Sequence, residues 1–483
     1  MQDKIYLKLE GHSQTTAMQE IIRICLKASV EITDELKNEN FVLSSLEKTE
    51  DKLLITTTII FMGRQGKESF EYSLSPEKNY NQNATNGVKL AFYRLFSRLF
   101  DKTLPWGMQT GIRPALLAMK YNLPFDQTIK RLMDDYDISR EKAELACLVA
   151  ENEKTLLKAK PRRGISLYIG VPFCPTRCLY CSFVSLPLSK QKRNILPAYA
   201  EALSKEIEYV GKMIKEEGEI LDSIYIGGGT PTSFDNDSLK TVLNTVKNSF
   251  DINSLYEYTI EAGRADTITL QKLETIKSLT PSSLRISINP QTLNDGVLKA
   301  IGRNHTAQEF INSFNMARSL GFSNINCDII AGLPFETKDM FLNSLKQLCT
   351  LHPENITMHT MCVKRAASLK NAENTSCCDE EVTQGVSMGG EILKSNGYIP
   401  YYMYRQKDTI GGLENTGYSL PGHEGLYNVL MMEDISTVIG LGAGGVSKLL
   451  DHKTGKIERV YNYKDPWEYI NNFDEMLNRK RLK

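Results

Sequence analysis

Three cysteines stand within eight positions in the stretch GVPFCPTRCLYCSF, residues 170–183. They are Cys174, Cys178 and Cys181, and the prolines around them indicate a loop. Thiolates this close together in sequence bind metals or exchange disulfides. The nearest histidine in sequence is His305, so the stretch supplies three candidate ligands and no evident fourth.

Four interpretations of these thiols differ in how many of them they use. A structural zinc site takes four ligands, commonly as two close pairs, and no second C-x-x-C pair is evident. A redox dithiol of Cys178 and Cys181 leaves Cys174 without a role. Inert buried thiols do not suit a proline-containing loop. An iron-sulfur cluster on three thiolates uses all of them and leaves one iron open to a further ligand.

The elements around this loop alternate in type. From Ser166 onward six short, β-branched runs are separated by amphipathic helical stretches: SLYIGVPF, SIYIGGG, YTIEAG, SLRISINP, NINCDIIAG and NITMHTMCV. This alternation predicts a parallel sheet with right-handed crossovers, either open and doubly wound or a partial (β/α) barrel. In both architectures the chemistry gathers where the strands end. The cysteines follow the first run, GGGTPT (227–232) ends the second and Glu261 ends the third, so we expect one shared pocket.

The cysteine loop resembles that of a known family. The pattern of Cys174, Cys178, Tyr180 and Cys181 resembles the signature of the radical S-adenosylmethionine (SAM) enzymes. The resemblance implies a [4Fe-4S] cluster whose open iron binds SAM, and a radical derived from SAM that abstracts hydrogen from a substrate. We therefore expect an α/β fold: a partial (β/α)6 radical SAM barrel with a small N-terminal α+β domain and a C-terminal extension.

Further motifs are similar to those of the oxygen-independent coproporphyrinogen III oxidase-like group. The segment WGMQTGIRP (106–114) and the glycine-rich run GLGAGGVS (440–447) resemble its HemZ-type, coproporphyrinogen dehydrogenase-like branch. The resemblance covers about Ser166 to Lys448. It implies metal ligation by Cys174, Cys178 and Cys181, and cofactor binding by Tyr168, Tyr180, Gly228, Gly229, Thr230, Glu261, Gln291, Arg303, Asp328, Cys362 and Val446.

The implied function is oxidative decarboxylation of coproporphyrinogen III to protoporphyrinogen IX without oxygen. The implied partners are a tetrapyrrole substrate and a low-potential electron donor of the flavodoxin or ferredoxin type. Candidate cations for the substrate's propionates are Lys364, Arg365, Arg405 and Lys407.

Two alternatives stay open. The well-defined oxidases have a further cysteine two residues beyond the third, where this chain has Phe183, and the loop is closer in this respect to the heme-chaperone branch. The chain is then a heme-binding chaperone or trafficking protein with a retained cluster, for which His359, His423 and the Cys377-Cys378 pair are candidate axial ligands. The other alternative is a different radical SAM reaction on a tetrapyrrole, such as methylation or ring opening.

Composition limits the classes of protein to consider. The 483 residues are 41% hydrophobic and carry 58 basic and 58 acidic side chains, so no net charge attracts nucleic acid. No apolar run reaches the length of a membrane span, and we expect a cytoplasmic protein with reduced thiols. Breaks in composition predict an N-terminal α+β domain of unknown role (1–157), a radical SAM core (164–370) and a C-terminal substrate-side region (371–483).

Overall fold

The computed structural model describes residues 3–35, 40–160, 164–183, 185–188, 193–362 and 378–482. The chain divides into two compact units. The first comprises Met1–Cys147 and Arg405–Leu413, and the second comprises Leu148–Tyr404 and Glu414–Lys483. Within the described residues no helix is both long enough and apolar enough to cross a membrane.

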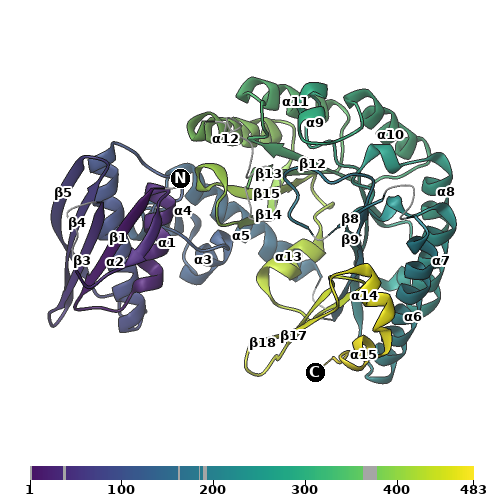
Figure 1. Ribbon diagram of the computed structural model, residues 1–483, viewed down its shortest axis with the longest axis horizontal. Coiled ribbons are helices and arrows are strands. Elements are labelled where there is room, and N and C mark those ends of the chain that lie inside the picture. The colour runs from purple at the N-terminus through teal and green to yellow at the C-terminus, as the bar shows by residue number, and fades with distance from the viewer. Residues whose placement is uncertain are drawn as a thin grey trace. The chain divides into compact units, whose positions relative to one another are not determined.

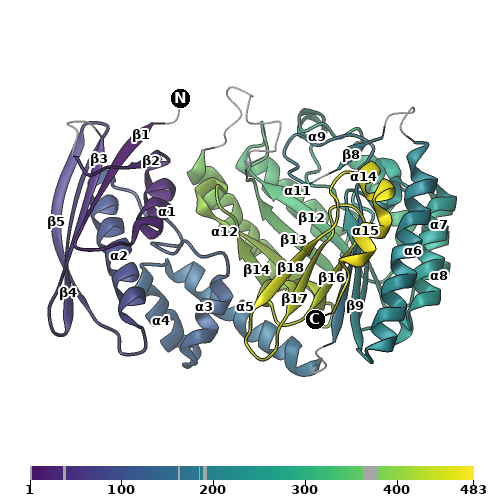
Figure 2. The ribbon, with the colours of Figure 1, turned by 60° about the horizontal axis from the view of Figure 1, so that its bottom comes forward.

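The first unit is built on a five-stranded mixed sheet with the order β2-β1-β3-β4-β5. Strand β4 alternates in burial, and its buried residues Leu53, Ile55 and Ile59 lie on the face that packs against α2. Figure 2 shows α1 and α2 together on one face of this sheet. The expected small α+β domain is therefore confirmed. Its elements are β1 (Lys4–Glu10), α1 (Thr15–Leu26), β2 (Ser29–Ile32), β3 (Phe41–Lys48), β4 (Lys52–Phe61), β5 (Arg64–Ser73), α2 (Tyr80–Phe100), α3 (Pro114–Tyr121), α4 (Phe125–Tyr136) and the first part of α5 (Arg140–Ala159).

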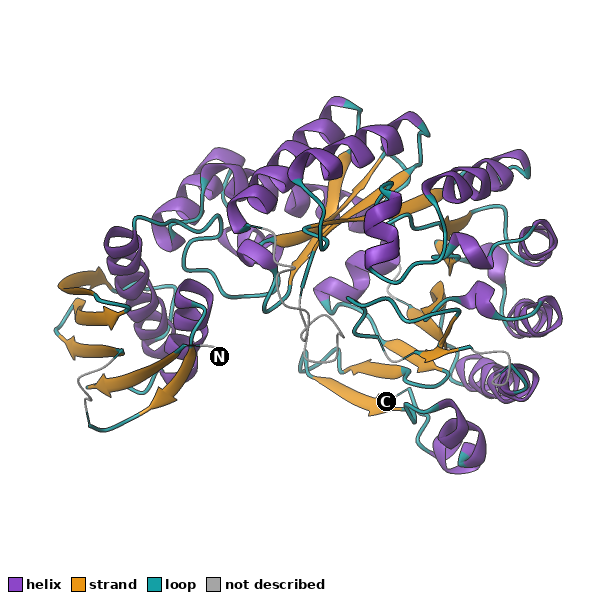
Figure 3. Cartoon of the chain, turned by 45° about the horizontal axis from the view of Figure 1, so that its top comes forward, coloured by secondary structure: helices purple, strands orange, loops and turns teal. Residues whose placement is uncertain are grey.

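The second unit contains the six strands expected from the alternating pattern. They pair in parallel and in chain order: β6 (Ile165–Val171), β9 (Leu221–Gly228), β10 (Glu257–Glu261), β11 (Leu284–Ser287), β12 (Ile325–Ala331) and β13 (Asn355–Thr360). The helices that connect them are α6 (Ile195–Glu216), α7 (Asn236–Ser249), α8 (Leu270–Leu279), α9 (Asp295–Ala300), α10 (Ala307–Ser319) and α11 (Lys338–Thr350). Figure 1 shows these helices on the outer side of the curved sheet, and Figure 3 shows the same layering by element type.

Polar side chains start several of the connecting helices at a defined residue. Asp235, Thr269, Thr306 and Thr337 each accept a hydrogen bond from a backbone N–H in the first turn of the helix that follows. At Thr306 the bond is reciprocated by Glu309, which completes a capping box. These caps set where each crossover helix begins after its strand.

The C-terminal part of the chain extends this sheet at both edges. The full order is β14-β15-β13-β12-β11-β10-β9-β6-β16-β17-β18, and no pairing between described residues joins the two ends. Strand β15 runs antiparallel to β13, whereas β16 runs parallel to β6. The elements involved are α12 (Asp379–Ser395), β14 (Ile399–Arg405), β15 (Glu414–Ser419), α13 (Leu426–Glu433), β16 (Val438–Leu441), β17 (Val446–Leu450), β18 (Ile457–Tyr461), α14 (Pro466–Asn471) and α15 (Phe473–Asn478).

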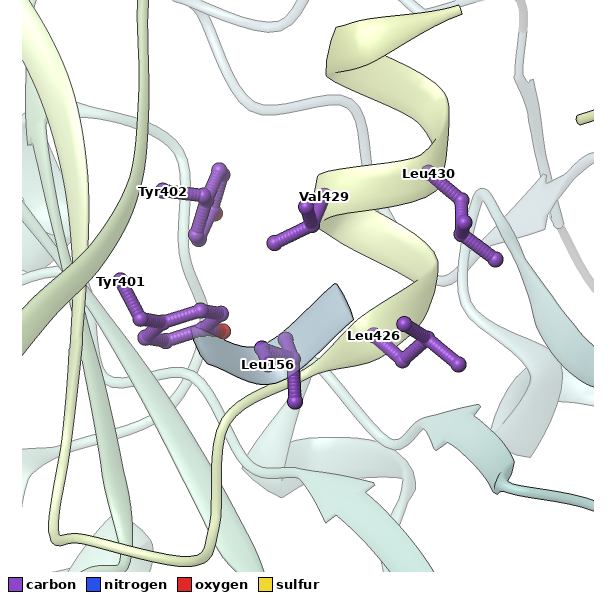
Figure 4. Packing of buried hydrophobic residues seen from close by; sticks show 6 residues of the cluster. All are labelled: Leu156, Tyr401, Tyr402, Leu426, Val429 and Leu430. Carbon is purple, nitrogen blue, oxygen red and sulfur yellow. The ribbon is translucent and has the colours of Figure 1, made fainter. Parts of the chain in front are cut away.

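An apolar cluster packs α13 onto the sheet. Leu426, Val429 and Leu430 of α13 pack in one cluster with Tyr401 and Tyr402 of β14. Leu156 of α5 belongs to the same cluster. Figure 4 shows these six side chains around α13: Val429 lies on the side of the helix toward Tyr401 and Tyr402, and Leu430 lies on the other side. Burial of this apolar surface holds the C-terminal segment against the sheet.

The two faces of the parallel strands differ in chemistry. Residues that alternate toward the covering helices are apolar and fully buried, as Leu167, Ile224 and Ile286 are. The opposite face carries polar side chains that bond to one another from strand to strand. Ser223 donates to Ser166 at 2.8 Å, Asn326 donates to Ser287 at 3.2 Å, and Thr357 donates to Asn326 at 3.2 Å. The inner face is thus suited to a polar ligand.

Candidate functional site

The cysteine loop follows β6 directly and is folded by its own backbone. Phe173 and Cys174 form a short strand, β7, which pairs with β8 (Leu186–Pro187). Cys181 N donates to Cys178 O at 3.1 Å, which closes a tight turn between two of the thiols. All three cysteines are free of disulfides; Cys178 is buried, while the other two are partly exposed.

Polar groups from two neighbouring strand ends contact the thiols. Thr230, after β9, lies 3.5 Å from Cys174 Sγ, and Arg264, after β10, donates to Cys178 Sγ at 3.5 Å. Burial raises the pKa of the Cys174 and Cys181 thiols. Because the thiolate is the form that binds metal, partners such as the Arg264 guanidinium are needed to favour it.

The glycine-rich turn after β9 packs directly against the cysteine loop. Gly229 N donates to Val171 O at 2.8 Å and Thr230 N donates to Phe173 O at 2.7 Å. A Cβ at Gly229 would lie 2.5 Å from Phe173 O, and Gly228 has a φ of +107°, so neither position accepts another residue without strain. The structure therefore brings Gly228, Gly229 and Thr230 together with the cysteines, and close backbone packing accounts for both glycines.

Tyr168 and Glu261 belong to one layer on the inner face, and Tyr225 of β9 lies between them. The Tyr225 hydroxyl donates to Glu261 Oε1 at 2.5 Å, and its ring stacks on Tyr168 with centroids 6.2 Å apart. Tyr225 also stacks on Tyr427, with centroids 4.7 Å apart. Burial raises the pKa of Glu261 to about 7. Tyr225 was not expected as a site residue; its place two residues before the glycine turn, on the same face of the strand, is the signal that could have identified it.

A second set of hydrogen bonds, made by Arg303, lies beyond the end of β11. Arg303 donates to Gly263 O at 3.1 Å and to Asn289 O at 2.6 Å, and its Nη2 lies 3.3 Å from the Tyr180 hydroxyl. Arg303 thus ties the aromatic residue of the cysteine loop to the ends of β10 and β11. Its Nε has no partner among the described residues.

Gln291 follows β11 and lies next to Asp328, which is in the middle of β12. Gln291 N donates to Asp328 O at 3.0 Å, and Gln291 has a φ of +67°, an uncommon value for glutamine. Its side-chain Oε1 is buried without a hydrogen-bond partner in the described part of the chain. Burial opposes ionisation of Asp328, but the nearby His359 (Nε2–Oδ2 3.8 Å) and Asn326 outweigh it and lower its pKa.

The remaining expected positions are more distant in the sheet. Cys362 follows β13, and Val446 begins β17, which is separated from β6 by β16. The glycine-rich run before Val446 does pack on the first strand, since a Cβ at Gly170 would lie 3.2 Å from Leu441 O.

Two of the four candidate substrate cations lie in the part of the chain that the structure describes. Arg405 and Lys407 belong to the first unit. The Arg405 guanidinium donates to the carbonyl oxygens of Gln109 and Gly412, and Lys407 pairs with Glu20 at 2.8 Å. Lys364, Arg365 and Cys377 lie outside the described residues.

Both a protein family and individual relatives match this sequence. Residues 168–348 match the Radical SAM superfamily profile. The chain is 37% identical over 456 residues to the "Oxygen-independent coproporphyrinogen-III oxidase-like protein HemZ" of Bacillus subtilis, which covers 91% of this chain and 89% of the relative. The chain belongs to this radical SAM family.

More distant relatives carry a different name. "Heme chaperone HemW" of Lactococcus lactis is 28% identical over 303 residues, which cover 62% of this chain and 73% of the relative. Among solved structures, coproporphyrinogen III oxidase (HemN) from Escherichia coli superposes with a TM-score of 0.53 at 22% identity, covering 67% of this chain and 73% of that one. The expected radical SAM fold is thereby confirmed.

Membership of the radical SAM family implies a [4Fe-4S] cluster and SAM, and the residues present fit both. Three free thiols lie on one loop, two of them contacted by a hydroxyl or a guanidinium. Within the described residues no three His, Cys, Asp or Glu side chains converge as they would on a single metal ion. In a four-iron cluster each thiolate binds a different iron, so such convergence is not required. The unpartnered Gln291 Oε1 and Arg303 Nε offer polar groups to a ligand such as SAM.

Proposed function

We propose that this protein is a radical SAM enzyme that decarboxylates coproporphyrinogen III to protoporphyrinogen IX without oxygen. The observation that carries the proposal is the 37% identity to the HemZ protein over nearly the whole chain, together with a cysteine loop whose thiols contact Thr230 and Arg264 after two neighbouring strands. The likeness to HemN supports the fold of this assignment.

The proposed division of labour places the cluster on Cys174, Cys178 and Cys181. Gly228, Gly229 and Thr230 would expose backbone groups to SAM, Glu261 would accept from its amino or hydroxyl groups, and Asp328 with Gln291 would contact the remaining polar groups. Tyr168, Tyr180, Arg303, Cys362 and Val446 complete the proposed cofactor contacts. When bound, the cluster and SAM supply abstraction of a hydrogen atom.

Each reacting propionate side chain loses one hydrogen atom, one molecule of carbon dioxide and one electron, and becomes a vinyl group. The hydrogen atom goes to the SAM-derived fragment, and an external one-electron acceptor takes the electron. A flavodoxin- or ferredoxin-type donor is the proposed source of the electron that starts each round.

A second candidate is a heme-binding chaperone that keeps the cluster. It is favoured by the relatives named heme chaperones and by Phe183 at the position after Cys181-Ser182. Phe183 is 67% exposed, so it contributes an apolar side chain to the surface rather than a further thiol.

One anaerobic experiment separates these functions. The reconstituted protein is mixed with SAM, a reductant and coproporphyrinogen III, and the products are identified by mass spectrometry. The oxidase proposal expects the singly and doubly decarboxylated tetrapyrroles. SAM cleavage without either product contradicts it, and stoichiometric heme binding without turnover supports the chaperone.

The ligand assignment has its own test with a matched control. Cys178→Ala is expected to lose the cluster's visible absorption and the bound iron. Cys349→Ala removes another buried cysteine, on α11, and is expected to keep both. Retention of a full cluster by Cys178→Ala contradicts the proposed ligation.

A further inference from the structure

A buried arginine that the family motifs do not use contacts the middle thiol of the cysteine loop. Arg264 lies three residues beyond Glu261, just before the short 3-10 turn Ala265–Thr267. Only 2% of its surface is exposed, and its Nη1 lies 3.5 Å from Cys178 Sγ. It therefore places a full positive charge beside a proposed cluster ligand in a site with little water to screen it.

Four further contacts fix the orientation of this guanidinium. Asp266 accepts two hydrogen bonds from Arg264, at 2.9 Å from Nε and 2.8 Å from Nη2. Thr176, within the cysteine loop, accepts from Nη2 through its hydroxyl at 3.1 Å and from Nη1 through its carbonyl at 3.4 Å. A two-pronged ion pair of this kind sets both distance and direction. The sulfur contact is thus built into the loop.

The charges of the pair are maintained despite burial. A guanidinium is not deprotonated in proteins, and that of Arg264 donates two hydrogen bonds to Asp266. Burial raises the pKa of Asp266, but the bond and charge of Arg264 outweigh it and the net shift is downward. Arg264 therefore stays cationic and Asp266 stays anionic near neutral pH.

We propose that Arg264 is a positioning residue that orients the Cys178 thiolate and raises the reduction potential of the cluster. A donor and a positive charge at a ligand sulfur stabilise the more negative, reduced state of a cluster more than its oxidised state. Asp266 limits this effect, because its negative charge opposes that of Arg264. The proposal rests on the proposed cluster ligation but not on which substrate the enzyme uses.

The two charges predict shifts of opposite sign. Arg264→Gln removes the cation and is expected to lower the midpoint potential, with the reduction equilibrium falling about tenfold, or 59 mV for a one-electron couple. Asp266→Asn leaves Arg264 held by Thr176 and is expected to raise the potential. A purely structural role of the pair would not give opposite signs, because either substitution would loosen the same loop.

The measurement is a potentiometric titration of the reconstituted holoprotein, followed by electron paramagnetic resonance. Arg318→Gln is the matched control: Arg318 also pairs with an acid, Glu354 at 2.9 Å, and donates to the carbonyls of Phe322 and His352, but it has no contact with the cysteine loop. It is expected to leave the potential unchanged. Iron content is measured for every protein before the titration.

Each outcome supports or overturns the inference. If Arg264→Gln does not retain iron, Arg264→Lys takes its place. A smaller fall in midpoint potential is then expected, because the ammonium keeps the positive charge but not the planar set of guanidinium donors. Unchanged potentials, or shifts of the same sign in the Arg264 and Asp266 variants, overturn the inference. A wild-type protein that forms no cluster contradicts the proposed function instead, so the two failures are distinguishable.

Discussion

Tyr225 influences the ionisation of Glu261, a carboxylate of the candidate site. Glu261 is partly buried, and the loss of solvent around its carboxylate raises its pKa to about 7, while the hydrogen bond from the Tyr225 hydroxyl opposes this rise. The Tyr225 ring stacks on both Tyr168 and Tyr427. Glu261 is thus poised to change its ionisation near neutral pH, where it would meet SAM.

We predict that SAM binding depends on pH through Glu261. Its pKa is raised, so the carboxylate is ionised only above about pH 7 and is protonated below it. The dissociation constant for SAM should increase by up to about tenfold per pH unit below that value. Tyr225→Phe removes a hydrogen bond to the ionised carboxylate of Glu261. The midpoint of the pH profile for SAM binding should therefore move to higher pH.

Calorimetric titration with SAM across the neutral range, under anaerobic conditions, measures both effects. Tyr258→Phe is the matched control, because the Tyr258 hydroxyl on the same strand as Glu261 is buried without a hydrogen-bond partner among the described residues. Its pH profile should match that of the wild type. Identical midpoints in the wild type and Tyr225→Phe would refute the role assigned to Tyr225.

At the scale of elements, the glycine-rich run before β17 is held by one side chain of α6. Glu206 is fully buried and accepts hydrogen bonds from Gly442 N at 2.8 Å, from Asn462 at 2.9 Å and from the Tyr469 hydroxyl at 2.6 Å. It also pairs with Lys480 at 2.8 Å. Four segments of the C-terminal region therefore depend on one carboxylate of α6.

We predict that Glu206→Gln loosens this region. Removing one partner of a buried pair leaves the Lys480 charge uncompensated, which costs about 3–5 kcal/mol of unfolding free energy. Hydrogen exchange at residues 440–446 should accelerate, and denaturant unfolding should report the loss of stability. Glu201→Gln, on the same helix, removes an exposed pair with Lys205 and should change neither measurement. Equal effects of the two substitutions would contradict the anchoring role.

At the scale of the whole molecule, the second unit is assembled from segments far apart in sequence. Strands β16 to β18 add to one edge of the parallel sheet, and β14 and β15 add to the other. Helix α5 packs where α13 and β14 meet, and it carries a buried acid, Glu153, at this place. Neither carboxylate oxygen of Glu153 has a hydrogen-bond partner among the described residues.

We predict that Glu153 makes the protein less stable as pH rises. Burial raises its pKa to about 9, with a further contribution from Glu433. The unfolded chain releases this proton above about pH 4.5 and the folded chain only above about pH 9, so stability falls between these values. Glu153→Gln should remove the penalty and stabilise the protein by about 3 kcal/mol at pH 7. Thermal unfolding of the wild type and Glu153→Gln near pH 5 and pH 8 tests this. A gain in stability from the substitution that is the same at both pH values would contradict the prediction.

Local pattern was sufficient for a large part of the fold. The six β-branched runs beginning at Ser166 predicted six parallel strands, and the structure confirms them. Their chain order was left open by the alternation, which fits a doubly wound sheet as well as a partial barrel. Strand and helix periods are properties of neighbouring residues, so a sequence carries them directly. The prolines around the cysteines likewise predicted a loop, and three thiols within eight positions cannot lie far apart.

The contacts that tune the site depend on the tertiary structure instead. Arg264 is separated from Cys178 by 86 positions and Tyr225 from Glu261 by 36, and only the parallel pairing of the strands brings them together. Arg405 was a candidate substrate cation by charge alone, yet its guanidinium binds carbonyl oxygens in the first unit. The sequence by itself determined which elements form and which residues could do chemistry. The tertiary structure decided which of those residues meet, because strand order and burial arise from contacts that no local period encodes.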